Sequence, residues 1–171
     1  MYKKCEEILN KLESEGKIKI SDYQFPPKQE LKLKLEDIIK LDYSNPIIRY
    51  EAELGNPNNT ESRKKIWDSS FKIYENGKIS NESIPTITTK QDRFPNSGVI
   101  EYEPVDKSKS KFRYLTPREC FLLMGFDDAD FEKASQVNSN AQLYKQAGNS
   151  IVVPVLESIL KEIIKAQHEK Q

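Results

Sequence analysis

The apolar positions at the start of the chain recur at the spacing of one helix face. With lysine and glutamate between them and Gly16 after them, they predict a short amphipathic helix built on Tyr2, Cys5, Ile8, Leu9 and Leu12. The Phe25-Pro26-Pro27 segment then favours extended backbone, because proline restricts the residue before it. Leucines alternate with lysines after it, at Leu31, Leu33 and Leu35, and a helical turn is predicted over residues 36–39.

The middle of the chain has short alternating patterns separated by turn residues. Residues 44–62 are rich in Asn, Pro, Ser and Thr, which predicts a loop and a domain boundary. Apolar residues alternate around Asn76-Gly77, a pair that accepts the positive φ of a type I′ turn, so residues 71–79 predict a β-hairpin. Further strands are predicted at Thr86–Thr89 and Val99–Glu103, giving small, irregular β structure.

The pattern changes to helix after Arg113. Thr116-Pro117-Arg118-Glu119 has the form of a capping box with proline at the first helical position. A final helix is predicted to begin near Asn149 or Ser150, with Pro154 in its first turn. Its apolar stripe comprises Val152, Val155, Leu156, Ile159, Leu160 and Ile163.

Composition bounds the size of the core and the overall charge. The 171 residues suffice for one ordinary domain or two small ones. The content of 36% hydrophobic and 32% charged residues fits a protein that is extended or that covers part of its surface with a partner. The 27 basic and 27 acidic residues cancel, so no global charge attracts nucleic acid. The stretch from Thr86 to Arg118, however, contains seven basic residues and only four acidic ones.

The sequence has few cysteine and histidine residues that could bind a metal ion or act as a nucleophile. Cys5 and Cys120 are far apart and lack metal-ligand neighbours, which argues against a disulfide, a zinc site or any other metal site. His168 is the one histidine, and no role is assigned to it. No apolar run reaches membrane-spanning length and no signal peptide is evident, so a soluble, cytoplasmic protein is expected.

Two segments, Tyr114–Phe126 and Tyr144–Leu156, resemble in order and spacing the last two motifs of the DNA cytosine-5 methyltransferases. The resemblance extends over residues 84–113, where Thr86-Ile87 matches the family's recognition region, and more weakly over residues 25–39. The family's Pro-Cys-Gln nucleophile motif and Gly-rich cofactor loop do not occur in this sequence.

This resemblance implies an α+β fold: a small irregular β target-recognition domain flanked by helices. The C-terminal helix would dock on a Rossmann-like catalytic domain that the chain does not contain. We expect three parts: an N-terminal helix and extended linker at 1–43, the target-recognition β region at 44–113, and a helical segment with both motifs at 114–171.

The resemblance also assigns site residues. Asn149, Ser150 and Val152 are expected to bind S-adenosyl-L-methionine, shared with the outside catalytic domain, although an ordinary helix cap would have the same Gly-Asn-Ser sequence. Thr116, Arg118 and Glu119 form a structural motif, and Arg118 is expected to pair with a carboxylate rather than with DNA phosphate. No catalytic residue is assigned, since neither cysteine has the nucleophile's sequence context.

The candidate DNA contacts lie between residues 84 and 98. Threonine hydroxyls suit phosphate contacts, and Lys, Gln and Arg donors suit base edges in the major groove, whereas the alternative is a solvated loop with incidental charge. The candidates are Thr86, Thr88, Lys90, Gln91 and Arg93.

Together these observations predict the DNA-recognition and cofactor-completing part of a DNA (cytosine-5-)-methyltransferase in a restriction-modification system. Its partners would be double-stranded DNA and a catalytic large subunit or domain, and the isolated chain is expected to be inactive. Two alternatives stay open: a stand-alone DNA-binding module, or an inactive gene fragment that buries its helix stripes in a homodimer. The target sequence is not readable from one chain.

Overall fold

The computed structural model describes residues 11, 13–16, 26–27, 34–80 and 83–168. Two compact units are present: Leu31–Val153 is the larger, and Met1–Glu30 with Pro154–Gln171 is the smaller. The larger unit contains the candidate site residues from Thr86 to Val152. The predicted helix over residues 2–12 and the alternating segment at 31–33 lie almost wholly outside the described residues.

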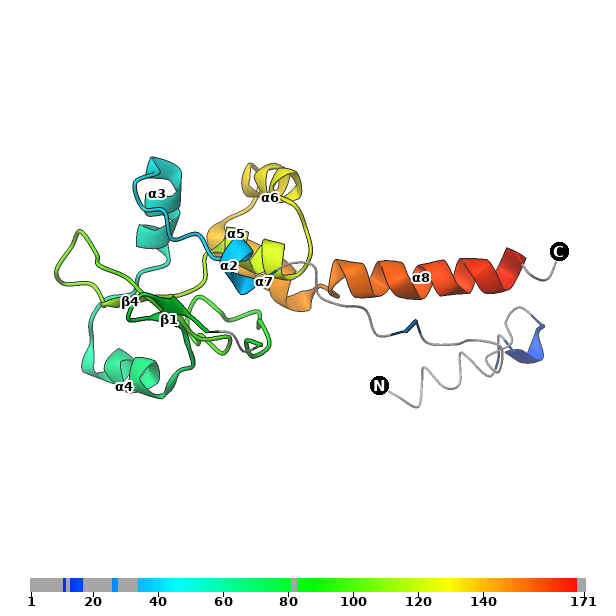
Figure 1. Ribbon diagram of the computed structural model, residues 1–171, viewed down its shortest axis with the longest axis horizontal. Coiled ribbons are helices and arrows are strands. Elements are labelled where there is room, and N and C mark those ends of the chain that lie inside the picture. Colours follow the sequence, from blue (N-terminus) through cyan, green and yellow to red (C-terminus); the bar gives the residue numbers. More distant parts are fainter. Residues whose placement is uncertain (1–10, 12, 17–25, 28–33, 81–82, 169–171) are drawn as a thin grey trace. The chain divides into compact units, whose positions relative to one another are not determined.

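The larger unit combines helices with a four-stranded sheet, which confirms the α+β class (Figure 1). Its described helices are α2 (Leu35–Ile38), α3 (Pro46–Leu54), α4 (Glu61–Ser69), α5 (Pro117–Leu123), α6 (Asp128–Ser135) and α7 (Asn140–Asn149). Its strands are β1 (Lys72–Glu75), β2 (Lys78–Ile79), β3 (Val99–Glu101) and β4 (Phe112–Arg113). The sheet order is β2-β1-β3-β4, with β1 and β3 parallel and the other two pairings antiparallel.

Successive residues of the strands face opposite sides of the sheet and therefore enter different clusters. Ile73 and Ile100 belong to the main core, which α5, α6 and α7 complete with residues such as Phe121, Phe131 and Leu143. On the other side, Trp67 of α4 packs with Val99, Phe112 and Tyr114. In Figure 1, α5 and α7 accordingly lie on a different side of the sheet from α4.

The predicted hairpin is confirmed. Glu75 pairs with Lys78 across the turn, where Asn76 and Gly77 have φ of 52° and 75°, as a type I′ turn requires. The Asn76 N–H also donates to the Glu101 carboxylate at 2.7 Å, which ties the turn to β3. By contrast, the strand predicted at Thr86–Thr89 is wrong: residues 83–88 have no regular secondary structure.

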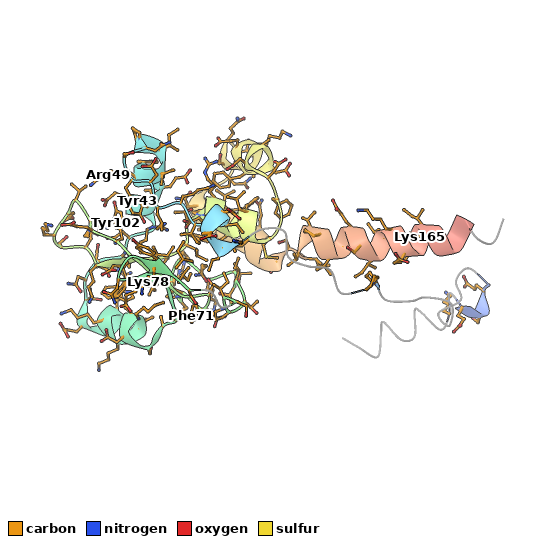
Figure 2. All side chains as sticks on the ribbon, viewed as in Figure 1. Tyr43, Arg49, Phe71, Lys78, Tyr102 and Lys165 are labelled. Carbon is orange, nitrogen blue, oxygen red and sulfur yellow. The ribbon has the colours of Figure 1, made fainter. Side chains whose placement is uncertain are left out.

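The loop predicted over residues 44–62 is confirmed only at residues 55–60, because α3 and the start of α4 occupy most of the rest. Asn45 is the N-cap of α3: its side-chain oxygen accepts from the Ile47 N–H at 2.9 Å, and Pro46 follows at the first helical position. Asn-Pro is therefore a helix start here rather than a turn. Beside α3, the rings of Tyr43 and Tyr102 pack edge to face with centroids 4.9 Å apart (Figure 2).

The smaller unit is described chiefly through α8 (Val153–His168). The helical prediction for this segment is confirmed, and the side chains of Val155, Leu156, Leu160 and Ile163 are exposed. None of the helices that the structure describes is long and apolar enough to cross a membrane.

Candidate functional site

Residues 86–98 form one loop between β2 and β3, called here the recognition loop. Its two ends are joined because the Asn96 side-chain N–H donates to the Thr86 carbonyl at 2.7 Å. Ile87 is buried in the main core and anchors the loop. Thr86, Lys90 and Arg93 are exposed and Thr88 is half-buried, so four of the five predicted DNA contacts have surface.

The fifth, Gln91, has a different environment. Its side chain is fully buried, and neither its amide nitrogen nor its amide oxygen has a hydrogen-bond partner among the described residues. Ser97 of the same loop is also buried, and its hydroxyl has no hydrogen-bond partner in the part of the chain that the structure describes. Gln91 cannot reach a base edge in this conformation, so its DNA contact stays a prediction that requires the loop to open.

The recognition loop packs directly on α7 through Gly148. A β-carbon on Gly148 would lie 2.4 Å from the Thr89 nitrogen and 2.5 Å from the Thr88 carbonyl carbon, closer than real β-carbons approach backbone. Glycine is therefore required by a close approach of two backbone segments. In the structure the recognition loop therefore fills the space beside Gly148.

The predicted cofactor residues follow Gly148 directly. The expectation that the last helix begins near Asn149 or Ser150 is wrong: Asn149 ends α7, Ser150 is its C-cap, and α8 begins only at Val153. Asn149 is exposed, and the Ser150 hydroxyl donates to the Ala147 carbonyl at 2.8 Å. Free N–H groups of a helix start are thus not available at Asn149 and Ser150, because these residues complete the preceding helix instead.

The same segment does offer surface to a ligand. The side chains of Ile151 and Val152 are 62% and 37% exposed beside the exposed Asn149 amide. An apolar face next to a carboxamide suits S-adenosyl-L-methionine, which has both an aromatic base and polar groups. These residues line neither the groove beside Trp67 and Phe112 nor the one between Tyr43 and Tyr102.

The predicted capping box is confirmed and has a larger role than a cap. Thr116 accepts from the Glu119 N–H, and the Glu119 carboxylate accepts from the Thr116 N–H at 2.8 Å. The Glu119 carboxylate also accepts a hydrogen bond from the Lys40 N–H. Both terminal nitrogens of Arg113 donate to the same carboxylate, at 2.8 and 2.9 Å. Arg113 and Glu119 have no exposed side-chain surface. Their ion pair joins β4, α5 and the residue two positions after α2.

Burial of Arg113 opposes its charge, but the Glu119 carboxylate outweighs this and holds the pKa of the guanidinium above its ordinary value. Arg113 also donates to the Lys40 carbonyl and the Tyr43 hydroxyl. No pattern in the sequence separates Arg113 from the surface charges near it. Arg113 is identified as a buried residue only by its position in the structure, where it pairs with Glu119 of the capping box.

Arg118 pairs with carboxylates, as expected. Its Nε contacts both oxygens of Glu51 at 3.0 and 3.1 Å, and its terminal nitrogens reach Asp128 at 2.7 Å and Glu132 at 2.5 Å. The guanidinium also lies 4.5 Å from the ring centroid of Phe131. This cluster connects α3, α5 and α6, so Arg118 is occupied within the fold.

The basic surplus between Thr86 and Arg118 is therefore smaller at the surface than in sequence. Beyond Arg113 and Arg118, Lys107, Lys109 and Lys111 line a groove of about 670 Å³ with Trp67 and Phe112. Three carboxylates share that lining, namely those of Asp68, Glu101 and Glu103. Exposed cations of the recognition loop itself are Lys90 and Arg93.

Neither nucleophile nor metal chemistry is assembled by the described residues. Cys120 is fully buried, and burial, followed by the Glu119 carboxylate, raises the pKa of its thiol well above the ordinary value. A thiol held neutral in this way is a packing group rather than a nucleophile. No cluster of three or more His, Cys, Asp or Glu suited to a metal ion occurs in the described part of the chain.

Comparison with known proteins decides the family. The family model of the C-5 cytosine-specific DNA methylases matches residues 4–165. The chain belongs to this family. It is 36% identical over 146 residues to the type II methyltransferase M2.ScrFI of Lactococcus lactis subsp. cremoris, a match covering 85% of this chain and 38% of that protein.

Two further relatives show how much of the chain the similarity covers. The type II methyltransferase M.Bsp6I of Bacillus sp. (strain RFL6) is 32% identical over 154 residues, covering 85% of this chain and 45% of that protein. The orphan methyltransferase M.SPRI of Bacillus phage SPR is 59% identical over a shorter stretch of 64 residues, 37% of this chain and 15% of that protein. The chain thus spans less than half the length of these methylases.

Proposed function

We propose that this chain is the DNA-recognition and cofactor-pocket part of a DNA (cytosine-5-)-methyltransferase in a restriction-modification system. Family membership supports the reaction class. The contact of Gly148 with Thr88 and Thr89 is the observation that supports combining DNA recognition and cofactor binding in this chain. It joins the recognition loop, which would read DNA, to the segment that would line the S-adenosyl-L-methionine pocket. DNA reading and cofactor binding would then share one rigid support.

The chemical step requires residues that this sequence lacks. Methyl transfer to C5 of cytosine begins with attack by a cysteine thiolate, and the sequence has no Pro-Cys-Gln motif while Cys120 is buried. A catalytic large subunit or domain would supply the nucleophile and most of the cofactor pocket. S-adenosyl-L-methionine provides the methyl group when bound, and Asn149, Ser150 and Val152 would contact it from this chain.

Radiolabelled methyl transfer to DNA tests the reaction. The chain alone should be inactive, and activity should appear on mixing with host extract that lacks this gene. In the reconstituted enzyme, Ser150→Ala should raise the apparent KM for the cofactor. Ser135→Ala is the matched control, because Ser135 likewise donates to the carbonyl three residues earlier, at 2.9 Å, on α6. Equal kinetics of the two variants would refute the cofactor assignment.

DNA binding is tested on the chain by itself with duplexes of random sequence at several salt concentrations. Lys90→Ala and Arg93→Ala should each weaken binding and lower the salt slope by about 1, because each removes one cation that neutralises a DNA phosphate. Lys133→Ala, an exposed lysine of α6, should leave the slope unchanged. Tight, sequence-selective binding with no methyl transfer in any mixture would instead favour a stand-alone DNA-binding module.

A further inference from the structure

The groove beside Trp67 and Phe112 has no part in the proposed function. Its lining comes from α4 and from the connection between β3 and β4, and none of it belongs to the recognition loop. In Figure 1, α4 lies well apart from α7, the helix on which the recognition loop packs. We propose that this groove binds an extended segment of a partner protein, in which an apolar side chain is flanked by acidic residues.

Aromatic side chains form the floor of the groove. Trp67 and Phe112 line it and are each 3% exposed. The volume of about 670 Å³ falls within the roughly 300–1,000 Å³ of typical ligand-binding clefts. An apolar floor within a charged rim is the usual anatomy of a contact between proteins. The groove is therefore suited to an apolar side chain that brings charged neighbours with it.

One polar group of this floor lacks a partner. The indole N–H of Trp67 is buried and has no acceptor among the described residues. Buried donors in native proteins nearly always have an acceptor, so this N–H is an exception that a ligand could remove. A carbonyl or carboxylate oxygen that reached it from the groove would satisfy it, and peptides carry both.

Lysine ammonium groups supply the positive part of the rim. Lys107 lies 3.4 Å from the Glu103 carboxylate, in a pair that is exposed on both sides. Lys111 is exposed and makes no ion pair with the described residues, and its ammonium lies 5.1 Å from the ring centroid of Phe112. Lys111 thus places an available cation beside the aromatic floor, where an acidic side chain of a ligand could pair with it.

The acidic residues of the rim favour a peptide over a nucleic acid. Asp68 is exposed, 90% of the Glu103 side chain is exposed, and both residues line the groove. Every phosphate of a nucleic acid is negative, so these carboxylates oppose a phosphate backbone. A peptide avoids this conflict, because its N–H groups can donate to the carboxylates while its own acidic side chain meets Lys111.

The experiment selects binders of the full chain from a displayed library of random linear peptides. Trp67 is the single tryptophan of the sequence, so tryptophan fluorescence reports on this groove alone. Enriched peptides should share an apolar residue next to Asp or Glu, and titrating them should change the Trp67 emission. Lys111→Glu should weaken their binding about tenfold, and Lys111→Gln less, because the first reverses the charge and the second only removes it.

Lys78→Glu is the matched control, since Lys78 is an exposed lysine of the same sheet outside the groove, and it should leave peptide binding unchanged. All variants should unfold at the same temperature as the wild type. A selection that enriches no common sequence overturns the inference. So do peptides that leave the Trp67 emission unchanged or that bind the Lys111→Glu variant as tightly as the wild type.

Two further outcomes would give the groove to another occupant and also overturn the inference. One is a DNA duplex that changes the Trp67 emission of the wild type but not of the Lys111→Glu variant. The other is a chain that sediments as a dimer and becomes monomeric on the same substitution, which would place a second copy in the groove. Neither outcome bears on methyl transfer, so the proposed function is tested separately.

Discussion

Gly148 lies so close to Thr89 that a β-carbon at position 148 would be 2.4 Å from the Thr89 backbone nitrogen. The contact joins two segments far apart in sequence, the recognition loop and the end of α7. Since Asn149 directly follows Gly148, a movement of the loop would be transmitted to residues 149–152, which are proposed to contact the cofactor.

Gly148→Ala should destabilise the larger unit by about 1–3 kcal/mol, the usual cost of overpacking a closely packed contact. The neighbouring atoms belong to the backbone of Thr88 and Thr89 and cannot move aside as a flexible side chain would. Urea unfolding measures this change. Lys145→Ala, an exposed position of the same helix, should change the free energy of unfolding by no more than about 0.5 kcal/mol. Equal stabilities would show that the loop is not held by this contact.

The pair of Arg113 and Glu119 predicts a strong asymmetry between single and double substitutions. Arg113→Met alone should cost about 3–5 kcal/mol, because it leaves a buried carboxylate without its partner. The double variant with Glu119→Leu should cost less than the sum of the two single changes. Denaturant unfolding of the four proteins gives the coupling energy. Strict additivity would mean that the two side chains are not coupled in solution.

Gln91→Met tests the buried amide of the recognition loop. Leaving buried amide atoms without partners costs about 1–3 kcal/mol, so an apolar side chain of similar size should leave stability unchanged or raise it. Thermal unfolding checks this, and DNA binding of the same variant tests the predicted base contact. Marked destabilisation would show that the amide has partners in solution, and unchanged sequence preference would remove Gln91 from the DNA contacts.

The buried phenol of Tyr102 predicts a loss of stability at alkaline pH. Burial, then the hydrogen bond and charge of Glu53, raise the pKa of Tyr102 above its ordinary value of 10.0, and the two oxygens are 2.6 Å apart. Above pH 10.0 the unfolded chain has lost this proton while the folded chain keeps it, so the free energy of unfolding falls as pH rises.

Tyr102→Phe should therefore show a shallower fall than the wild type between about pH 9 and pH 11.5 in pH-dependent unfolding. Some fall should persist, since burial also raises the pKa of Tyr43 and of Tyr144. Tyr50→Phe, at an exposed tyrosine, should follow the wild-type curve. If the Tyr102 variant follows it too, the phenol does not retain its proton in the folded protein.

Local sequence determined those elements whose signal lies within a few residues. The Asn76-Gly77 hairpin and the Thr116–Glu119 capping box formed as predicted, because the turn dihedrals and the cap bonds involve only neighbours in the chain. The same local reasoning failed at Asn45-Pro46, where one dipeptide suits both a turn and a helix start. It also failed at Thr86–Thr89, where β-branched residues have no neighbouring strand to pair with.

The sequence by itself thus determined the family motifs, the α+β class and the local caps and turns of this protein. Only the tertiary structure decided which charged groups are available to DNA: Arg113 and Arg118 pair with carboxylates from other elements, and Gln91 is buried within its own loop. It also decided that Gly148 receives the recognition loop. Burial and pairing depend on residues distant in sequence, and no pattern along the chain contains those distances.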